Sequence, residues 1–116
     1  MPKWFHEQML HKYWIDRCKK YKINNQKILG SKLNPIFDTY PDISENQLEN
    51  GKVVPCEIEW STTDFNHDIS LLEENNGFLV VFVKNADFSV PQVIINEEDF
   101  LVWITKKSKK IAIETL

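Results

Sequence analysis

PDISENQLENGKVVPCEIEW, residues 41–60, is the stretch of the sequence on which the prediction of the fold depends. Its Asn50-Gly51 pair lies between two segments of strand-like residues, a pattern that predicts a β-hairpin with a two-residue type I′ turn. In that hairpin Asp42 lies opposite Glu59. Residues that lie opposite each other, or two apart along a strand, share one face of a sheet. We therefore expect Asp42, Glu57 and Glu59 to converge on one side of the hairpin.

Three carboxylates within reach of one another need compensation of their charge. They repel unless a positive group lies among them or some of them take up a proton. A hard divalent cation such as Mg²⁺, which prefers carboxylate and water oxygens, is the natural occupant. The alternative interpretation is that Glu57 and Glu59 form the solvated face of a strand and that Pro41-Asp42 is a turn.

The predicted register has a difficulty near the turn. It places Ser44 opposite Glu57, but it leaves Leu48 and Val53 on the carboxylate side of the hairpin. A β-bulge at Pro55 would reconcile the two halves and would shift the pairing by one residue. The convergence of the two glutamates survives that shift, whereas the place of the aspartate is left open.

The composition fits a single folded domain spanning residues 1–116. The chain is 42% hydrophobic and 12% aromatic, and its net charge of −3 argues against attraction to nucleic acid through bulk charge. A local basic patch can still bind a phosphate backbone. The longest apolar run, Phe78 to Val83, is too short to cross a membrane, and the N-terminus does not resemble a signal peptide. With Cys18 and Cys56 expected to be reduced structural thiols, we expect a cytoplasmic protein with no membrane partner.

The periodicity before the hairpin changes from helix to strand. Apolar residues recur at three- and four-residue steps over residues 3–22, which predicts an amphipathic helix. Asn24-Asn25 predicts a turn, and the alternation of residues 36–42 predicts a strand. Two segments are ambiguous: residues 26–35, and residues 111–116, which fit a helix or a strand.

The pattern after the hairpin alternates between helix and strand. Residues 61–64 are rich in N-cap types and start a helix that residues 75–77, Asn-Asn-Gly, bring to an end. Residues 78–83 are apolar on both faces, which predicts a central strand covered on both sides. A short strand at 93–95 then leads to a helix capped by Asn96. The whole order predicts an α/β fold with a mixed sheet.

This order, together with its acidic residues, resembles the PD-(D/E)XK nuclease superfamily. Pro41-Asp42, a hairpin and Glu57-Ile58-Glu59 on the return strand are followed by a helix and a buried strand, and 14 residues separate Asp42 from Glu57. The resemblance covers roughly residues 4–96. It implies the restriction-endonuclease-like fold, with an αβββαβ core and a mixed central sheet flanked by helices.

The resemblance also implies roles for individual residues. Asp42 would be the first metal ligand, Glu57 the second, and the backbone carbonyl of Ile58 would complete the site. Glu59 stands where the superfamily usually has Lys, although some of its restriction enzymes carry Glu there and remain active. Glu7 is the candidate for the acidic residue that the first helix often contributes. The implied catalytic residues are therefore Asp42, Glu57, Glu59 and Glu7, and the implied metal ligands are Asp42, Glu57 and Ile58.

The implied function is metal-dependent hydrolysis of phosphodiester bonds with Mg²⁺ or Mn²⁺ as cofactor. The expected substrate is DNA rather than RNA, and we expect a homodimer because a chain this small covers little of a duplex. One alternative is a catalytically silent nuclease-like fold that binds nucleic acid or protein, and another is a structural or regulatory protein. Without the usual Lys, a second metal or a displaced lysine, such as Lys84, would have to orient water and balance charge. Glu59 in the Lys position favours the alternatives, whereas the clustering of three acids favours the enzyme.

Histidines and basic runs are weaker candidates. His67, beside Asp68, is interpreted mainly as a surface or capping residue. His6 and His11 are five residues apart on the predicted helix, on different faces, and make a poor zinc pair. The runs at residues 19–22 and 106–110 fit solvated helix ends, or contacts to a nucleic-acid backbone if they flank the acidic cleft.

Overall fold

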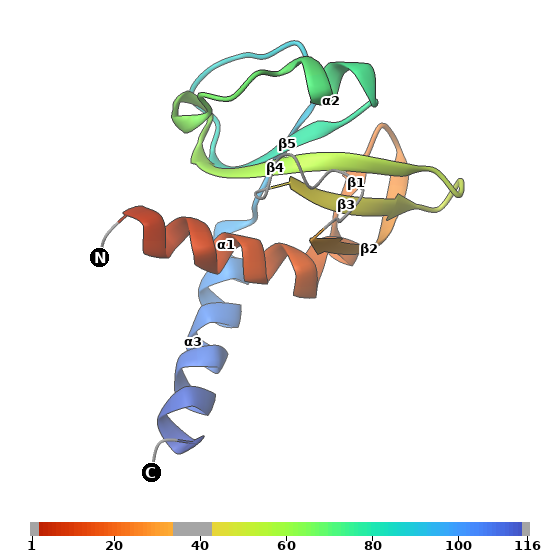
Figure 1. Cartoon of the computed structure of the whole chain (residues 1–116). Coiled ribbons are helices and arrows are strands. Elements are labelled where there is room, and N and C mark those ends of the chain that lie inside the picture. The colour runs from red at the N-terminus through yellow and green to blue at the C-terminus, as the bar shows by residue number, and fades with distance from the viewer. Residues whose placement is uncertain (1–2, 34–42, 115–116) are drawn as a thin grey trace.

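A computed structural model describes the backbone of residues 3–33 and 43–114 (Figure 1). The elements of these residues alternate between helix and strand. In chain order they are α1 (Lys3–Arg17), η1 (Cys18–Lys20), β1 (Lys22–Ile23), β2 (Gln26–Leu33), β3 (Ile43–Leu48), β4 (Val53–Ser61), η3 (Thr62–Asp64), α2 (Ser70–Glu74), β5 (Phe78–Val83), β6 (Gln92–Ile94) and α3 (Glu97–Glu114).

The strands of the described residues form one six-stranded sheet in the order β1-β2-β3-β4-β5-β6. Neighbours from β1 to β4 are antiparallel, whereas β4, β5 and β6 run parallel. Helices α1 and α3 lie on one side of the sheet and α2 lies on the other (Figure 1). The predicted α/β class, with a mixed sheet and flanking helices, is therefore confirmed.

The main core lies between the sheet and helices α1 and α3. Tyr13 and Trp14 of α1 are fully buried there, and so is Cys56 of β4. Trp14 Nε1 donates a hydrogen bond to Asn46 Oδ1 at 2.8 Å, and Asn46 Nδ2 donates to the carbonyl of Val54 at 3.1 Å. These bonds matter because a buried polar group without a partner costs stability. Cys18 and Cys56 are both buried and free, as expected of structural thiols.

The prediction that β5 is covered on both faces is confirmed. Phe78 and Val80 belong to the main core. Leu79 and Val81 belong to a second cluster on the opposite face, where they meet Leu72 of α2. Alternate residues of one apolar strand therefore serve two separate cores, as expected for a strand that has parallel neighbours on both sides.

The type I′ turn predicted at Asn50-Gly51 is wrong. Of this pair only Gly51 has a positive φ, at 87°. Its N–H donates to the carbonyl of Leu48 at 3.0 Å, and the N–H of Leu48 donates to the carbonyl of Lys52 at 2.9 Å. Residues 49–51 therefore form a three-residue loop, in which a tight turn is followed by a glycine in the left-handed conformation.

The longer loop changes the register of the hairpin. Ile43, rather than Ser44, lies opposite Glu57. The pairing runs past Pro55 without a shift, so the bulge predicted there is also wrong. Leu48 joins the main core in the observed register, whereas Val53 stays on the side of the glutamates and is 45% exposed.

A two-residue loop of the expected I′ kind occurs one hairpin earlier. Asn24 and Asn25 have φ values of 49° and 64°, and Ile23 pairs directly with Gln26 across them. Residues 26–33 of the ambiguous segment that follows form strand β2. Residues 36–42, which are predicted to form a strand and include Asp42, lie outside the described residues.

The helices differ in extent from the predictions. The first ends as an α-helix at Arg17 and continues as the short 3-10 helix η1. The single helix predicted after residues 61–64 is instead η3, an irregular segment and the five-residue α2. The last helix, α3, continues to Glu114, and Asn96 caps it through a 2.9 Å bond from the N–H of Asp99. Within the described residues, every helix is too short or too polar to cross a lipid bilayer.

Candidate metal site

Strand β4 carries two buried glutamates on the face that points away from the main core. Glu57 and Glu59 expose 2% and 8% of their surface. They lie opposite Leu79 and Val81 of β5, which belong to the second cluster. Ile58, between them, points into the main core. Since burying a carboxylate is costly without a partner charge or hydrogen bond, this face of β4 requires compensation.

The segment between η3 and α2 brings a histidine to these glutamates. His67 Nδ1 lies 3.5 Å from Glu57 Oε1. The imidazole stacks on Phe65 with 5.9 Å between ring centroids, and Phe65 meets Phe88 edge-on at 5.5 Å. Glu57, Glu59 and His67 each offer one ligand atom, and these atoms all lie within 4.8 Å of one another. The three side chains therefore form a cluster that a single ion can contact.

Helix α1 adds another carboxyl group to the cluster. Burial, the charge of Glu7 and the charge of Glu57 raise the pKa of Glu59 to about 8, and a side-chain hydrogen bond with Glu7 adds to the shift. The raised pKa favours the protonated form of the Glu59 carboxyl group at neutral pH, and this group interacts with the side chain of Glu7. A shared proton is the expected arrangement when two carboxyl groups meet in the absence of a cation.

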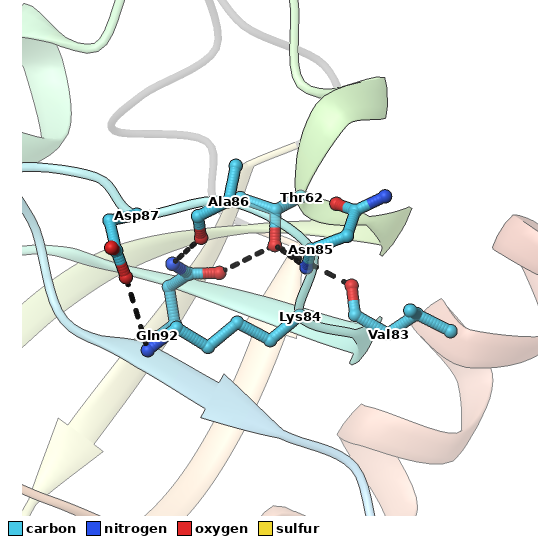
Figure 2. A network of polar contacts seen from close by, with 7 residues as sticks. All are labelled: Thr62, Val83, Lys84, Asn85, Ala86, Asp87 and Gln92. Carbon is cyan, nitrogen blue, oxygen red and sulfur yellow. Dashed lines mark hydrogen bonds and ion pairs between the residues drawn. The ribbon is translucent and has the colours of Figure 1, made fainter.

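A polar network holds the chain just after Glu59 (Figure 2). The fully buried Thr62 donates from Oγ1 to Gln92 Oε1 at 2.8 Å and accepts from the backbone N–H of Asn85 at 3.2 Å. Gln92 Nε2 in turn donates to the carbonyl of Ala86 at 2.8 Å. The network joins the ends of β4 and β5 to the start of β6, so the backbone that leads from β4 into η3 is firmly placed.

Two further charged residues lie at this end of the sheet. Asp64 Oδ2 accepts hydrogen bonds from Ser61 N at 3.1 Å and Ser61 Oγ at 2.8 Å, and its charge contributes to the raised pKa of Glu59. Lys84, the lysine considered as a substitute for the usual one, forms an ion pair with Asp87 at 3.6 Å (Figure 2). Lys84 is thus paired with Asp87 beside the polar network.

The structure brings together three of the implied site residues, namely Glu57, Glu59 and Glu7. Ile58 lies between the two glutamates of β4, with its side chain in the core. Asp42 lies outside the described residues. His67 is a weaker candidate from the sequence, because a lone His beside an Asp at a predicted helix start is usually a surface or capping residue. The irregular segment that replaces this helix carries His67 to Glu57.

The donor set of this cluster fits a divalent metal ion. Two ligands on opposite sides of one ion are about 4.2 to 4.6 Å apart, because each lies about 2.1 to 2.3 Å from it. The ligand atoms of Glu57, Glu59 and His67 lie within 4.8 Å of one another, which is close to this separation. A set of two carboxylates and one imidazole suits Mn²⁺, Fe²⁺ or Zn²⁺ better than Mg²⁺, which prefers oxygen ligands only.

Comparisons with known proteins do not assign a family. No protein-family model, curated protein or solved structure matches this chain. A function for this chain is therefore inferred from the geometry around Glu57, Glu59 and His67, and from the resemblance of its acidic motif to the PD-(D/E)XK superfamily.

Proposed function

We propose that this protein is a metal-dependent phosphodiesterase of the PD-(D/E)XK type that binds its ion through Glu57, Glu59 and His67. The observation that carries the proposal is the convergence of these three side chains within 4.8 Å, at a place where both carboxyl groups are buried. Perturbed carboxyl groups gathered around one point are typical of functional sites. A strand that served only as a solvated face would leave both glutamates exposed.

The order of the elements supports the restriction-endonuclease-like part of the proposal. Apart from the two-residue strand β1 and the short 3-10 helices, the chain runs from helix α1 through the antiparallel strands β2, β3 and β4 to helix α2 and the parallel strand β5, an order that supports an αβββαβ core. Strand β4 carries Glu57-Ile58-Glu59 at the position of the second motif. Asp42 directly precedes β3, where the first motif is expected.

The side chains have distinct tasks in this proposal. A divalent ion in the site would supply positive charge to a phosphodiester and to the attacking water. Glu57 and His67 would hold the ion through a carboxylate oxygen and an imidazole nitrogen. Glu59 has to release its proton before its carboxylate can bind a metal, because metal ligands are deprotonated. Before metal binds, the side-chain interaction with Glu7 orients the protonated Glu59 carboxyl group.

A DNA substrate and a cytoplasmic location stay predictions that rest on the resemblance and on the composition. One observation favours the second candidate function, a catalytically silent binding module. Glu59 occupies the usual Lys position and bonds to Glu7, while Lys84 pairs with Asp87. A nuclease of this kind would therefore have to balance charge through the ion itself.

The test is cleavage of plasmid, branched and single-stranded DNA with Mn²⁺, Mg²⁺ or EDTA in parallel. We expect cleavage in Mn²⁺, none in EDTA, and a loss of at least about 100-fold in Glu57→Ala. Glu49→Ala, in the exposed hairpin loop, is the matched control and should cleave normally. Cleavage that persists in EDTA contradicts the proposal. Binding of Mn²⁺ and of DNA without cleavage identifies the silent module instead.

A further inference from the structure

Helix α3 presents an exposed apolar surface at the point where it leaves the body of the protein. Leu101 and Val102 expose 52% and 51% of their surface, whereas Phe100 and Trp103 are buried on the opposite side of the helix. Asn96, Glu97 and Glu98 line a depression of about 420 Å³ together with Leu101 and Val102. The helix extends away from the sheet towards its C-terminal end (Figure 1). Its accessible side is therefore available to a partner.

The charges beside this surface have a regular spacing. Glu98 lies four residues before Val102, and Lys106 lies four residues after it, so the three side chains form one row along the helix. All three are exposed. Other charges of α3 form ion pairs with the rest of the described chain: Asp99 pairs with Lys20, and Lys107 pairs with Asp16.

A row with an acid at one end, an apolar residue in the middle and a base at the other end is complementary to itself. When two copies of α3 run antiparallel about a two-fold axis at Val102, each Glu98 faces the Lys106 of the other copy. A two-fold interface requires this property, because the same patch must serve both subunits. A partner of one charge sign would pair with only one end of the row.

We propose that the exposed face of α3, with Val102 at its centre, is the interface through which two copies of this chain form an antiparallel homodimer. The interface involves other residues than the metal site, so each proposal can fail without the other. Stable protein complexes bury at least roughly 1,200 Å² of accessible surface at their interface, and a single pair of helices is a small contact by comparison. We therefore expect the dimer to dissociate on dilution.

The test is the mass of the full chain in sedimentation equilibrium over a range of concentrations. We expect the native chain to approach twice its 13.7 kDa at high concentration. Glu98→Lys and Lys106→Glu should each weaken dimerisation about fivefold, and the double variant should return it to within about twofold of the native value. A monomer at every concentration, or single and double variants that behave alike, overturns the proposal.

A cross-link tests the position of the two-fold axis. Val102→Cys should form a disulfide-linked dimer under mild oxidation, because the axis places position 102 of one copy against position 102 of the other. Leu29→Cys is the matched control: Leu29 is 46% exposed on β2, far from α3 in the sequence, and should cross-link no faster than chance collision allows. Cys18 and Cys56 are buried and do not compete. Equal cross-linking of the two variants contradicts the proposed axis.

Discussion

Glu59 of β4 and Glu7 of α1 are joined by a hydrogen bond between their carboxyl groups, and the pKa of Glu59 is raised to about 8. The bond links the first helix to the strand at the centre of the candidate site. The pKa is raised because Glu59 is buried and lies close to the charges of Glu7, Glu57 and Asp64. A proton at neutral pH, or a metal ion, is what allows these groups to remain together.

The first prediction concerns stability and pH. The folded pKa of Glu59 is about 8, against 4.5 for an ordinary glutamate, so the folded state holds a proton that the unfolded state releases. The stabilisation is complete below about pH 4.5 and is lost as the pH rises through about 8. We expect the free energy of unfolding without metal to fall by up to about 5 kcal/mol over this range, because each unit of difference between the two pKa values corresponds to about 1.4 kcal/mol.

Urea unfolding at pH 5, 7 and 9 measures this effect. Glu59→Gln keeps the shape of the side chain and cannot ionise, so its stability should vary less over the same range. Glu49→Gln, on the exposed hairpin loop, is the control and should follow the native curve. A native curve that stays flat from pH 5 to 9 would show that Glu59 ionises normally.

The second prediction concerns His67. If its imidazole is a ligand, His67→Ala should lower the affinity for Mn²⁺ or Zn²⁺ by about 10- to 100-fold and should affect Mg²⁺ much less, because Mg²⁺ prefers oxygen ligands. Competition with a metal-sensitive dye measures these affinities. Asn66→Ala, at the exposed neighbouring position, should leave them unchanged. Equal affinities in His67→Ala and in the native chain would remove this residue from the site.

The third prediction concerns the polar network at the end of β4. Thr62→Val keeps the size of the side chain but deprives Gln92 Oε1 and the N–H of Asn85 of their partner. We expect a loss of about 1 to 3 kcal/mol, the usual cost of leaving a buried polar group unpaired. Thr63→Val, at an exposed position where water can replace the hydroxyl, should cost under about 0.5 kcal/mol. Similar losses in both variants would contradict the role assigned to the network.

The fourth prediction concerns Gly77, where the chain passes close to Pro55 of β4 just before β5 begins. A Cβ atom at Gly77 would lie 2.6 Å from the carbonyl oxygen of Pro55 and 3.0 Å from the Cα of Leu72, and backbone atoms cannot move aside cheaply. We expect Gly77→Ala to cost about 1 to 3 kcal/mol in thermal or urea unfolding. A Cβ at Gly30 meets no atom within 4 Å, so Gly30→Ala should be nearly neutral. Equal effects at the two glycines would show that the close approach is absent.

Much of the fold could be predicted because the signals are local. The apolar run of β5 and the cap at Asn96 each depend on a few adjacent residues, and both predictions are confirmed. The loop at Asn50-Gly51 could not be decided in this way, since two-residue and three-residue loops both accept Gly at this point. The burial of Leu48 in the main core favours the longer loop, and this contact depends on the whole sheet.

The site was less accessible to prediction than the fold. Alternation along β4 indicates that Glu57 and Glu59 share a face, but it does not reveal that both are buried. N-cap residues at 61–64 predict a continuous helix, whereas the chain folds irregularly and returns His67 to the strand. Glu7 was implied by the resemblance alone. Its hydrogen bond with Glu59 joins segments that are far apart in the sequence, so no local pattern indicates it.

The most direct test of the metal site is calorimetric titration of Mn²⁺ into the native chain and into Glu57→Gln at pH 7, in buffers of different ionisation enthalpy. We predict one tight site in the native chain, with release of about one proton per ion, because Glu59 is protonated before it binds metal. Proton release should fall towards zero at pH 9, above the pKa of Glu59, and Glu57→Gln should lose the tight site. Equal binding by the two proteins, or no binding by either, would contradict the proposed metal site.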